Sequence, residues 1–221
     1  MHSCPLCKKQ STMKMCEANS PVGLRTYYHC SLCDLVYLDP DQRLSSAAEL
    51  EQYNLHENSP DDPRYVEFLR QLTDPLFETL KSQVFLDRKD PKILDFGSGP
   101  TAVLSKILGD AGYIVNCYDP YFTDNSELLK GKYDVITSTE VVEHIYDPSA
   151  AFELLNSILA EDAYLFVMTG MKADWENFAG WHYRRELTHV CFFSHKTMEW
   201  IAHKYQWELK FPAPNVAIFK K

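Results

Sequence analysis

The stretch from residue 93 to residue 102, ILDFGSGPTA, constrains the fold of this chain more than any other. Three apolar residues and an acid run into Gly97-Ser98-Gly99, and apolar residues with helical spacing follow, which predicts a strand, a tight turn and a helix. The glycines let the backbone pass close under a ligand, and the unpaired N–H groups of a helix that opens near Thr101 point toward it. The pattern indicates a loop that binds a nucleotide cofactor, with an ordinary strand-to-helix turn as the alternative.

Length and charge limit the class of protein. With 221 residues the chain can form one α/β domain of ordinary size and a small appendage. Its net charge of -9 and its lack of clustered Lys and Arg argue against a surface that coats nucleic acid. The first residues lack the layout of a signal peptide, and no apolar run approaches the roughly 18 residues of a membrane-spanning helix. We therefore expect no membrane span and a cytoplasmic location.

Four cysteines form two C-x-x-C pairs, separated by about twenty residues: Cys4, Cys7, Cys30 and Cys33. Each pair has the spacing that lets two thiolates reach one tetrahedral zinc ion. Buried thiols or a redox pair are the alternatives, but a redox C-x-x-C normally opens a helix, which neither pair does. Cys16 lies off the pattern, and His29 is interpreted as a neighbour of the site. Residues 1–40 are thus predicted to be a zinc ribbon whose metal is structural and closed to catalysis.

Residues 41–90 are predicted to be a helical connector. Ser45 and Ser46 precede a short capped helix, and Asp62-Pro63 begins a longer one, because Pro suits the first helical turn. Asp74-Pro75 is predicted to start a further helix that turns inward Leu76, Leu80, Val84 and Phe85. Polar residues near the first of these helices indicate a lid over the ligand, with a solvated turn as the alternative: Tyr53, His56 and Asn58.

Residues 91–221 alternate apolar strands with helical segments. Strands are expected at residues 92–96, 113–118, 133–138 and 164–169, and an antiparallel closing pair at 207–211 and 216–219. This alternation predicts a mainly parallel sheet with helices on both faces. Ligands bind beyond the carboxyl ends of such strands, where we expect the Gly97 loop, Asp119, residues 139–144 and Gly170 to converge. The aromatic and basic segment 171–189 is expected to shape a substrate pocket there.

Asp119 ends the second strand, about twenty residues after the glycine loop. An acid at this place accepts two hydrogen bonds from a ribose diol, and an acid that caps the turn before Pro120 is the alternative. Too few residues separate Asp119 from Tyr133 for a complete strand–helix–strand unit, which needs about thirty. The third strand of the sheet is therefore predicted to be short or missing.

Residues 60–221 resemble the class I S-adenosylmethionine-dependent methyltransferases. The resemblance is carried by D-x-G-x-G at residues 95–99, by Asp119, by YDVITSTEVVEHI at 133–145 and by the two closing strands. E-x-x-E-H at 140–144 and HVCFFS at 189–194 are most similar to the ubiquinone-type O-methyltransferase group. The four-cysteine segment is similar to a device found in some sugar C-methyltransferases and in a ribosomal-RNA guanine methyltransferase.

This resemblance implies a Rossmann-like sheet of seven strands, the last of them antiparallel, that holds the methionine end of the cofactor over the glycine loop and the ribose on Asp119. The expected cofactor-binding residues are Asp95, Phe96, Gly97, Ser98, Gly99, Asp119, Pro120, Tyr121, Thr139, Glu140 and Val141. Tyr121 and Phe122 are candidates to stack on the purine, whose amino group has no assigned partner. A dinucleotide loop is the alternative, because GSGPTA also fits G-x-G-x-x-A, but the acid at Asp95 favours the methyltransferase.

Methyl transfer from a sulfonium needs a nucleophile held in line with the methyl–sulfur bond in a dry pocket. A hydroxyl nucleophile must also lose a proton near neutral pH, and histidine is suited to accept it. The catalytic candidates are His144 first, then His189, with Glu143 beside them. Because positions 140, 143 and 144 share one face of a helical turn, a Mg²⁺ or Mn²⁺ site is an alternative, which the E-x-x-E-H resemblance also implies. In a further alternative, Glu140 and Glu143 only complement a helix dipole.

The sequence therefore predicts methyl transfer from S-adenosylmethionine to an oxygen or carbon of a small or carrier-bound metabolite. A cofactor-binding sensor or assembly subunit without catalysis is one alternative. An RNA methyltransferase that grips phosphates with the ribbon and with Arg184-Arg185 is another, which the acidic charge disfavours.

Overall fold

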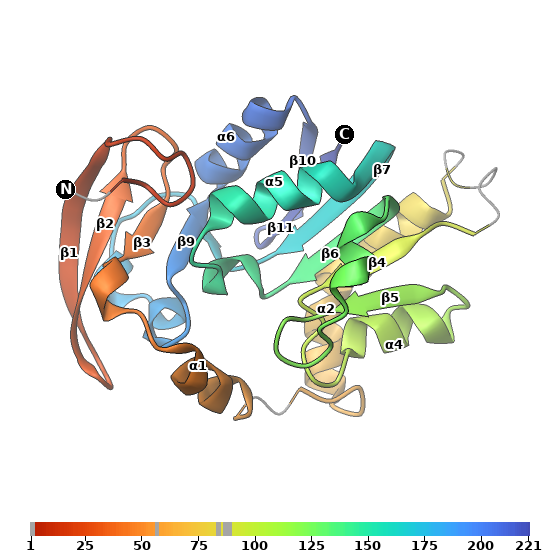
Figure 1. Cartoon of the computed structure of the whole chain (residues 1–221), viewed down its shortest axis with the longest axis horizontal. Coiled ribbons are helices and arrows are strands. Elements are labelled where there is room, and N and C mark those ends of the chain that lie inside the picture. The colour runs from red at the N-terminus through yellow and green to blue at the C-terminus, as the bar shows by residue number, and fades with distance from the viewer. Residues whose placement is uncertain (1–2, 56–57, 83–84, 86–89) are drawn as a thin grey trace.

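The computed structural model describes residues 3–55, 58–82, 85 and 90–221, and a six-stranded sheet forms its centre (Figure 1). The strands are ordered β10-β11-β7-β6-β4-β5, with the bounds Ile93–Phe96 (β4), Val115–Tyr118 (β5), Tyr133–Thr139 (β6), Leu159–Met168 (β7), Glu208–Ala213 (β10) and Val216–Lys220 (β11). β5, β4, β6 and β7 are parallel, and β11 is antiparallel to both β7 and β10. The predicted Rossmann-like sheet with an antiparallel last strand is confirmed.

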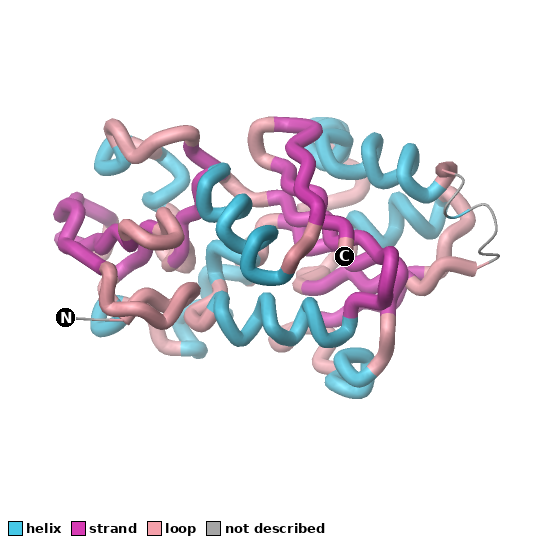
Figure 2. Tube along the Cα trace, turned by 90° about the horizontal axis from the view of Figure 1, so that it is seen from above, coloured by secondary structure: helices cyan, strands magenta, loops and turns pink. Residues whose placement is uncertain are grey.

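Helices cover both faces of this sheet (Figure 2). α2 (Pro63–Leu80) and α4 (Val103–Asp110) pack on the face that carries Ile93, Val135 and Phe166. α5 (Pro148–Ile158) and α6 (His195–Tyr205) pack on the face that carries Leu94, Ile136 and Leu165. Successive side chains of a strand point to opposite faces, so strands that are apolar throughout can support two cores.

The third strand of the sheet is replaced by irregular chain. Between β5 and β6, the described backbone forms one isolated antiparallel bridge, from Asp119 to Thr123, and a 3-10 helix, η2 (Ser126–Lys130). The sheet therefore has six described strands where the family resemblance implied seven, and the predicted loss of the third strand is confirmed.

The connector differs from prediction at Pro75. Pro75 lies inside α2, so no new helix starts there, and the described helix ends at Leu80. Proline in a helix removes one backbone hydrogen bond and costs about 3 kcal/mol. Burial of Leu72 and Leu76 on either side of Pro75 offsets this cost, because an interrupted helix could not place both on the sheet. The predicted inward residue Val84 and the predicted lid residue His56 lie outside the described residues.

A second sheet joins the N-terminal segment to the last third of the chain. Its strand order is β1-β2-β3-β9-β8, with the bounds Thr12–Ser20 (β1), Gly23–Cys30 (β2), Val36–Leu38 (β3), Met171–Lys172 (β8) and Cys191–Ser194 (β9). β3 pairs antiparallel with β9, which leads directly into α6. Tyr27 from the ribbon packs edge-on against Phe178 and Phe192, with ring centroids 5.0 and 5.8 Å away. The ribbon sheet thus shares a core with the segment that follows β7.

No helix in the described parts of the chain is long and apolar enough to cross a bilayer.

Candidate active site

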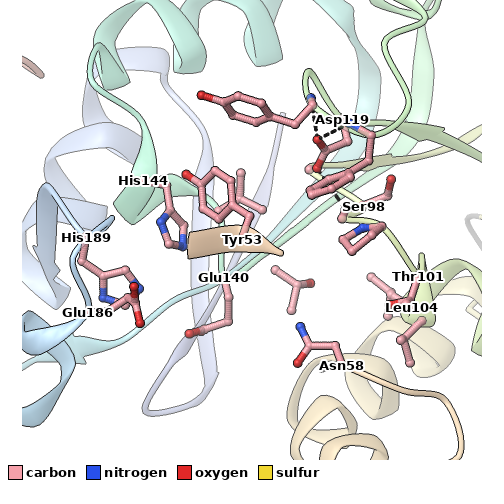
Figure 3. Close-up of a pocket in the computed structure, with 18 of the residues that line it drawn as sticks. Tyr53, Asn58, Ser98, Thr101, Leu104, Asp119, Glu140, His144, Glu186 and His189 are labelled. Carbon is pink, nitrogen blue, oxygen red and sulfur yellow. Dashed lines mark hydrogen bonds between the residues drawn. The ribbon is translucent and has the colours of Figure 1, made fainter. Parts of the chain in front are cut away.

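A cavity of about 960 Å³ opens at the carboxyl ends of β4, β5 and β6 (Figure 3). Figure 3 shows His144, His189 and Glu186 on one side of it and Ser98, Thr101 and Leu104 on the other. All predicted cofactor-binding residues except Phe96 line the cavity. Phe96 is buried and its ring stacks on Tyr118, with centroids 5.6 Å apart. The structure thus gathers the predicted residues around one cavity, and their binding roles stay predictions.

The glycine loop depends on two residues with positive φ, Gly97 at 83° and Gly99 at 65°. A Cβ atom on Gly97 would lie 2.4 Å from Cγ2 of Val141, which is far too close. Only glycine therefore fits position 97, and the loop after β6 packs directly on the loop after β4.

Asp119 holds the glycine loop and the loop after β5 together. Its Oδ2 accepts a hydrogen bond from the Gly99 N–H (3.0 Å), and its Oδ1 accepts from the N–H groups of Tyr121 (2.9 Å) and Phe122 (3.2 Å). A carboxylate has about four acceptor positions, so capacity for a ribose hydroxyl remains. The turn-capping role and the ribose role that the sequence presented as alternatives are compatible in one side chain.

Asp95 ties three elements together beneath the cavity. Its oxygens accept hydrogen bonds from Thr137 on β6 (2.9 Å) and Ser105 on α4 (3.0 Å). Burial raises the pKa of Asp95 to about 6. Asp95 thus positions the end of β4, and any contact with a ligand comes in addition to these bonds.

The cavity also holds hydroxyl groups that suit a polar ligand. The buried Ser98 Oγ and Thr139 Oγ1 atoms form no hydrogen bond with the described residues. Buried hydroxyls normally have a partner. Two such hydroxyls at the carboxyl ends of the neighbouring strands β4 and β6 fit a nucleoside cofactor with several hydroxyl and amino groups.

At the other end of the cavity, Tyr183 connects two carboxyl groups. Its hydroxyl donates to Oε1 of the fully buried Glu143 and lies 3.1 Å from Oε2 of Glu140. Thr169 donates to the other oxygen of Glu143 (2.8 Å). Burial raises the pKa of both Glu140 and Glu143, and the charge of Glu143 raises that of Glu140 further.

The two predicted histidines meet at this carboxylate. Nε2 of His144 and Nε2 of His189 each lie 4.0 Å from Oε1 of Glu143, and the two ring centroids are 4.6 Å apart. His189 Nδ1 lies 2.7 Å from the backbone oxygen of Tyr183. Because a carbonyl only accepts, Nδ1 carries the hydrogen, and in the neutral ring Nε2 is the proton acceptor.

Backbone pairing explains how His189 reaches a residue so distant in sequence. The N–H of Val190 donates to the carbonyl of Glu143 (2.9 Å), and the carbonyl of Val190 accepts from the N–H of Leu38 (2.8 Å). The segment before β9 is therefore held between the loop after β6 and the ribbon strand β3. The predicted catalytic residues are brought together by this pairing.

The sequence did not single out Tyr183 and Thr169 as parts of the catalytic end, whereas Gly170 was expected at the strand ends. A Cβ atom on Gly170 would lie 2.7 Å from the ring of Tyr183. The available signal was a glycine directly after a strand, followed by an aromatic loop, and such a signal does not say which aromatic residue packs on the glycine.

The four predicted zinc ligands form a second candidate site. Sγ atoms of Cys4 and Cys33, and of Cys7 and Cys30, lie 3.5 Å apart, and all four lie within 4.8 Å of one another. None of them is in a disulfide. Sulfur atoms around a tetrahedral zinc lie about 3.8 Å apart, since the Zn–S bond is about 2.3 Å. The cluster therefore fits a zinc ion, while His29 binds Asp34 (Nε2 to Oδ1, 2.8 Å).

The order of the main sheet, with an antiparallel strand between β7 and β10 and a cavity at the strand ends, defines a Rossmann-like methyltransferase. A family model described as "Methyltransferase domain" matches residues 64–210. The chain belongs to this family and is an S-adenosylmethionine-dependent methyltransferase.

One solved structure supports the fold, and two others are similar to the chain with lower TM-scores. An O-methyltransferase family protein from Burkholderia thailandensis matches with a TM-score of 0.52 and 10% identity over 78% of this chain and 61% of that chain. A SAM dependent methyltransferase from Archaeoglobus fulgidus matches with a TM-score of 0.48 and 15% identity over 71% of this chain and 99% of that chain. Magnesium protoporphyrin IX methyltransferase from Synechocystis PCC 6803 matches with a TM-score of 0.48 and 14% identity over 79% of this chain and 92% of that chain. No curated protein sequence matches the chain significantly.

Proposed function

We propose that this methyltransferase transfers the methyl group to an oxygen or carbon atom of a small or carrier-bound metabolite. The observation that carries the proposal is the pair of histidines around buried Glu143, facing the glycine loop across one cavity. The ubiquinone-type O-methyltransferases are the proposed subgroup, because E-x-x-E-H and the downstream histidine contribute to the same cluster.

S-adenosylmethionine supplies an electrophilic methyl group when it is bound. Asp119 offers its remaining acceptor positions to the ribose, and the Ser98 and Thr139 hydroxyls offer further hydrogen bonds along the same cavity. The aromatic residues Tyr53, Tyr65 and Phe68 line the cavity and exclude water. This arrangement holds the cofactor between the glycine loop and the histidine cluster.

Proton removal falls to His189 and His144. In His189 the hydrogen bond from Nδ1 to Tyr183 fixes the ring and leaves Nε2 as the base toward an acceptor hydroxyl. Glu143 lies 4.0 Å from Nε2, where a carboxylate stabilises the imidazolium that forms. If the methyl acceptor is a carbon atom of an aromatic ring, the same base removes the proton of a hydroxyl group on that ring, which makes the ring carbon more nucleophilic.

A divalent metal is the second candidate for the same cluster, with ligands that differ from those predicted. Glu143, His144 and His189 offer ligand atoms within 4.8 Å of one another, and Glu140 is joined to them through Tyr183. Two imidazoles and one carboxylate suit Mn²⁺ better than Mg²⁺. Adjacent ligands of such an ion lie about 3 Å apart, so the observed separations of 4.0 Å favour the proton-transfer role.

The structure weakens the RNA alternative at Arg184. This side chain is buried and donates to the backbone oxygens of Ala179 (2.7 Å) and Asn19 (3.1 Å). It therefore joins the ribbon to the loop after β8 and is not available to phosphates. Arg185 is exposed at the edge of the cavity and is the remaining cation of the pair.

Further proposals concern the organisation of the chain. We propose a zinc ribbon at residues 1–40, a connector and lid at 41–90 and the catalytic domain at 91–221, in a cytoplasmic protein with structural zinc. Tyr53 and Asn58 line the cavity, which supports the lid.

Calorimetry and label transfer test the proposed function. Zinc-loaded protein should bind S-adenosylhomocysteine, and methyl-labelled S-adenosylmethionine should label a pool of hydroxylated metabolites or their carrier-bound forms. Absence of S-adenosylhomocysteine binding would overturn the proposal. Binding without transfer to any pool would favour the sensor, and salt-sensitive labelling of RNA would favour the RNA enzyme.

A further inference from the structure

Glu49 occupies an unusual place in the short helix α1 (Ser46–Tyr53). It is the one buried residue of this helix, with 5% of its surface exposed, and it lines the cavity. An acid in the first turn complements the helix dipole, but it gains this from an exposed position too. Burial of a carboxylate costs several kcal/mol unless partners compensate. The position of Glu49 thus calls for a partner in the cavity.

The hydroxyl groups of two tyrosines surround the carboxylate of Glu49. The Tyr121 hydroxyl donates to Oε2 (2.8 Å), and the Tyr146 hydroxyl also interacts with this carboxylate. A carboxylate has about four acceptor positions, so two hydroxyl groups leave capacity for a further donor. The charge of Glu49 contributes to the raised pKa of Tyr53 and of Tyr146, after the larger effect of burial. A hydrogen-bond donor from a ligand would complete this environment.

The neighbours of Glu49 indicate which part of a ligand lies there. Tyr121 follows the proposed ribose-binding Asp119 by two residues, and both Pro120 and Phe122 line the cavity beside it. The ring of Tyr53 lies 5.3 Å from that of Tyr121. Aromatic faces next to the ribose site suit a purine ring. The edge of adenine presents an exocyclic amino group, which is a donor and needs an acceptor.

The missing third strand leaves that acceptor to another element. None of the residues 123–132, which replace the strand and its helix, lines the cavity. Their acids Asp124 and Glu127 are exposed. Glu49 reaches the loop after β5 through the hydroxyl group of Tyr121.

We infer that Glu49 of α1 accepts a hydrogen bond from the amino group of adenine and so selects the base of the cofactor from outside the Rossmann-like sheet. This inference rests on the proposed cofactor site. It assigns to α1 a specificity-determining residue, with Tyr121 as the positioning residue that orients its carboxylate.

Calorimetry with two ligands tests the inference without any methyl acceptor. S-adenosylhomocysteine carries the 6-amino donor, and S-inosylhomocysteine carries a 6-oxo acceptor at the same place. Wild-type protein should bind the adenosyl compound at least about tenfold more tightly, because a carboxylate accepts from the amino group and repels the oxo group. Glu49→Gln should bind both within about threefold, since an amide either accepts or donates.

Glu51→Gln is the matched control, because it makes the same change at an exposed position of α1. Glu51→Gln should keep the wild-type preference for the adenosyl compound. Tyr121→Phe should reduce the ratio between the dissociation constants of the two compounds. Thermal unfolding of each variant checks that it is folded. An unchanged preference in Glu49→Gln, or a wild-type protein that binds both compounds alike, would overturn the inference and leave the cofactor site intact. Failure of wild-type protein to bind either compound would overturn the proposed function itself.

Discussion

The hydroxyl of Tyr183 donates a hydrogen bond to the buried carboxylate of Glu143, and the backbone oxygen of the same tyrosine accepts one from Nδ1 of His189. One residue of the loop after β8 thus orients both an acid and a base of the candidate active site. It does so through two separate atoms, so that side-chain and backbone effects can be tested apart.

Tyr183→Phe should lower the free energy of unfolding by about 1–3 kcal/mol, because a buried carboxylate loses a donor. Methyl transfer should fall, while the Kd for S-adenosylhomocysteine stays within about threefold, since Tyr183 lies at the acceptor end. Denaturant unfolding and calorimetry measure both effects. Tyr113→Phe is the control, because the hydroxyl of Tyr113 forms no hydrogen bond to the described residues. A higher free energy of unfolding, or unaltered turnover, in Tyr183→Phe would contradict the proposed place of Tyr183 in the active site.

Gly170→Ala should reproduce the loss of turnover although the hydroxyl group of Tyr183 is still present. The new Cβ would lie 2.7 Å from the Tyr183 ring, which must then move. Gly180→Ala is the control, because a Cβ there has no neighbour within 4 Å. A crystal structure or side-chain NMR of the variant should show a displaced Tyr183. An unmoved Tyr183 ring together with full activity would contradict the close packing of Tyr183 on Gly170.

His189→Asn should keep the donor toward the Tyr183 carbonyl and lose Nε2. We expect turnover to fall by about 10²–10⁴, the range of general base catalysis, with S-adenosylhomocysteine binding retained. The assay is label transfer to an acceptor found in the metabolite pools. His203→Asn, on the exposed side of α6, should behave like wild type. Wild-type turnover in His189→Asn would leave His144 as the base.

Asp95 should make the protein less stable as pH rises. Burial raises its pKa from 3.8 to about 6, so the folded state binds a proton that the unfolded state has released between these values. Stability is therefore highest below the lower value, falls through about pH 6 and is level above it, with a total near 3 kcal/mol. About 1 kcal/mol of this falls between pH 5 and 7.

Asp95→Asn should abolish this pH dependence. Between pH 5 and 7 the wild-type protein should therefore lose about 1 kcal/mol of unfolding free energy relative to the variant. Comparing the two proteins cancels the pH dependence of zinc binding, which both share. Asp124→Asn, at an exposed position, should show no such shift. A difference that stays constant with pH would mean that Asp95 is not protonated on folding.

The four-cysteine cluster should hold one zinc ion per chain. Cys30→Ser should lose the metal and lower the thermal stability, because the ribbon strand β3 supports the segment before β9. Cys16→Ser should retain the metal, since Cys16 lies outside the cluster. Metal analysis by atomic absorption decides the matter. A full zinc content in Cys30→Ser would refute the assignment of these ligands.

Local chemistry in the sequence was enough to predict the elements with short-range causes. Ser45 caps α1 because its hydroxyl accepts the N–H of Ala48 (3.4 Å), three residues ahead. The glycine loop, the C-x-x-C pairs and the missing third strand also depend only on spacing and chain length. These features need no knowledge of distant residues, so the fold class and the cofactor loop could be predicted.

Only the tertiary structure placed Glu143 between His144 and His189, because the pairing of Val190 with Glu143 and Leu38 joins three distant segments. It also decided that Pro75 stays inside α2 and that Tyr183, rather than another aromatic residue of its loop, meets both acids. Burial of Glu49 beside Tyr121 has the same origin. Such contacts are chosen by packing over the whole molecule, since many side chains of a loop have suitable chemistry and only one arrangement fills the space.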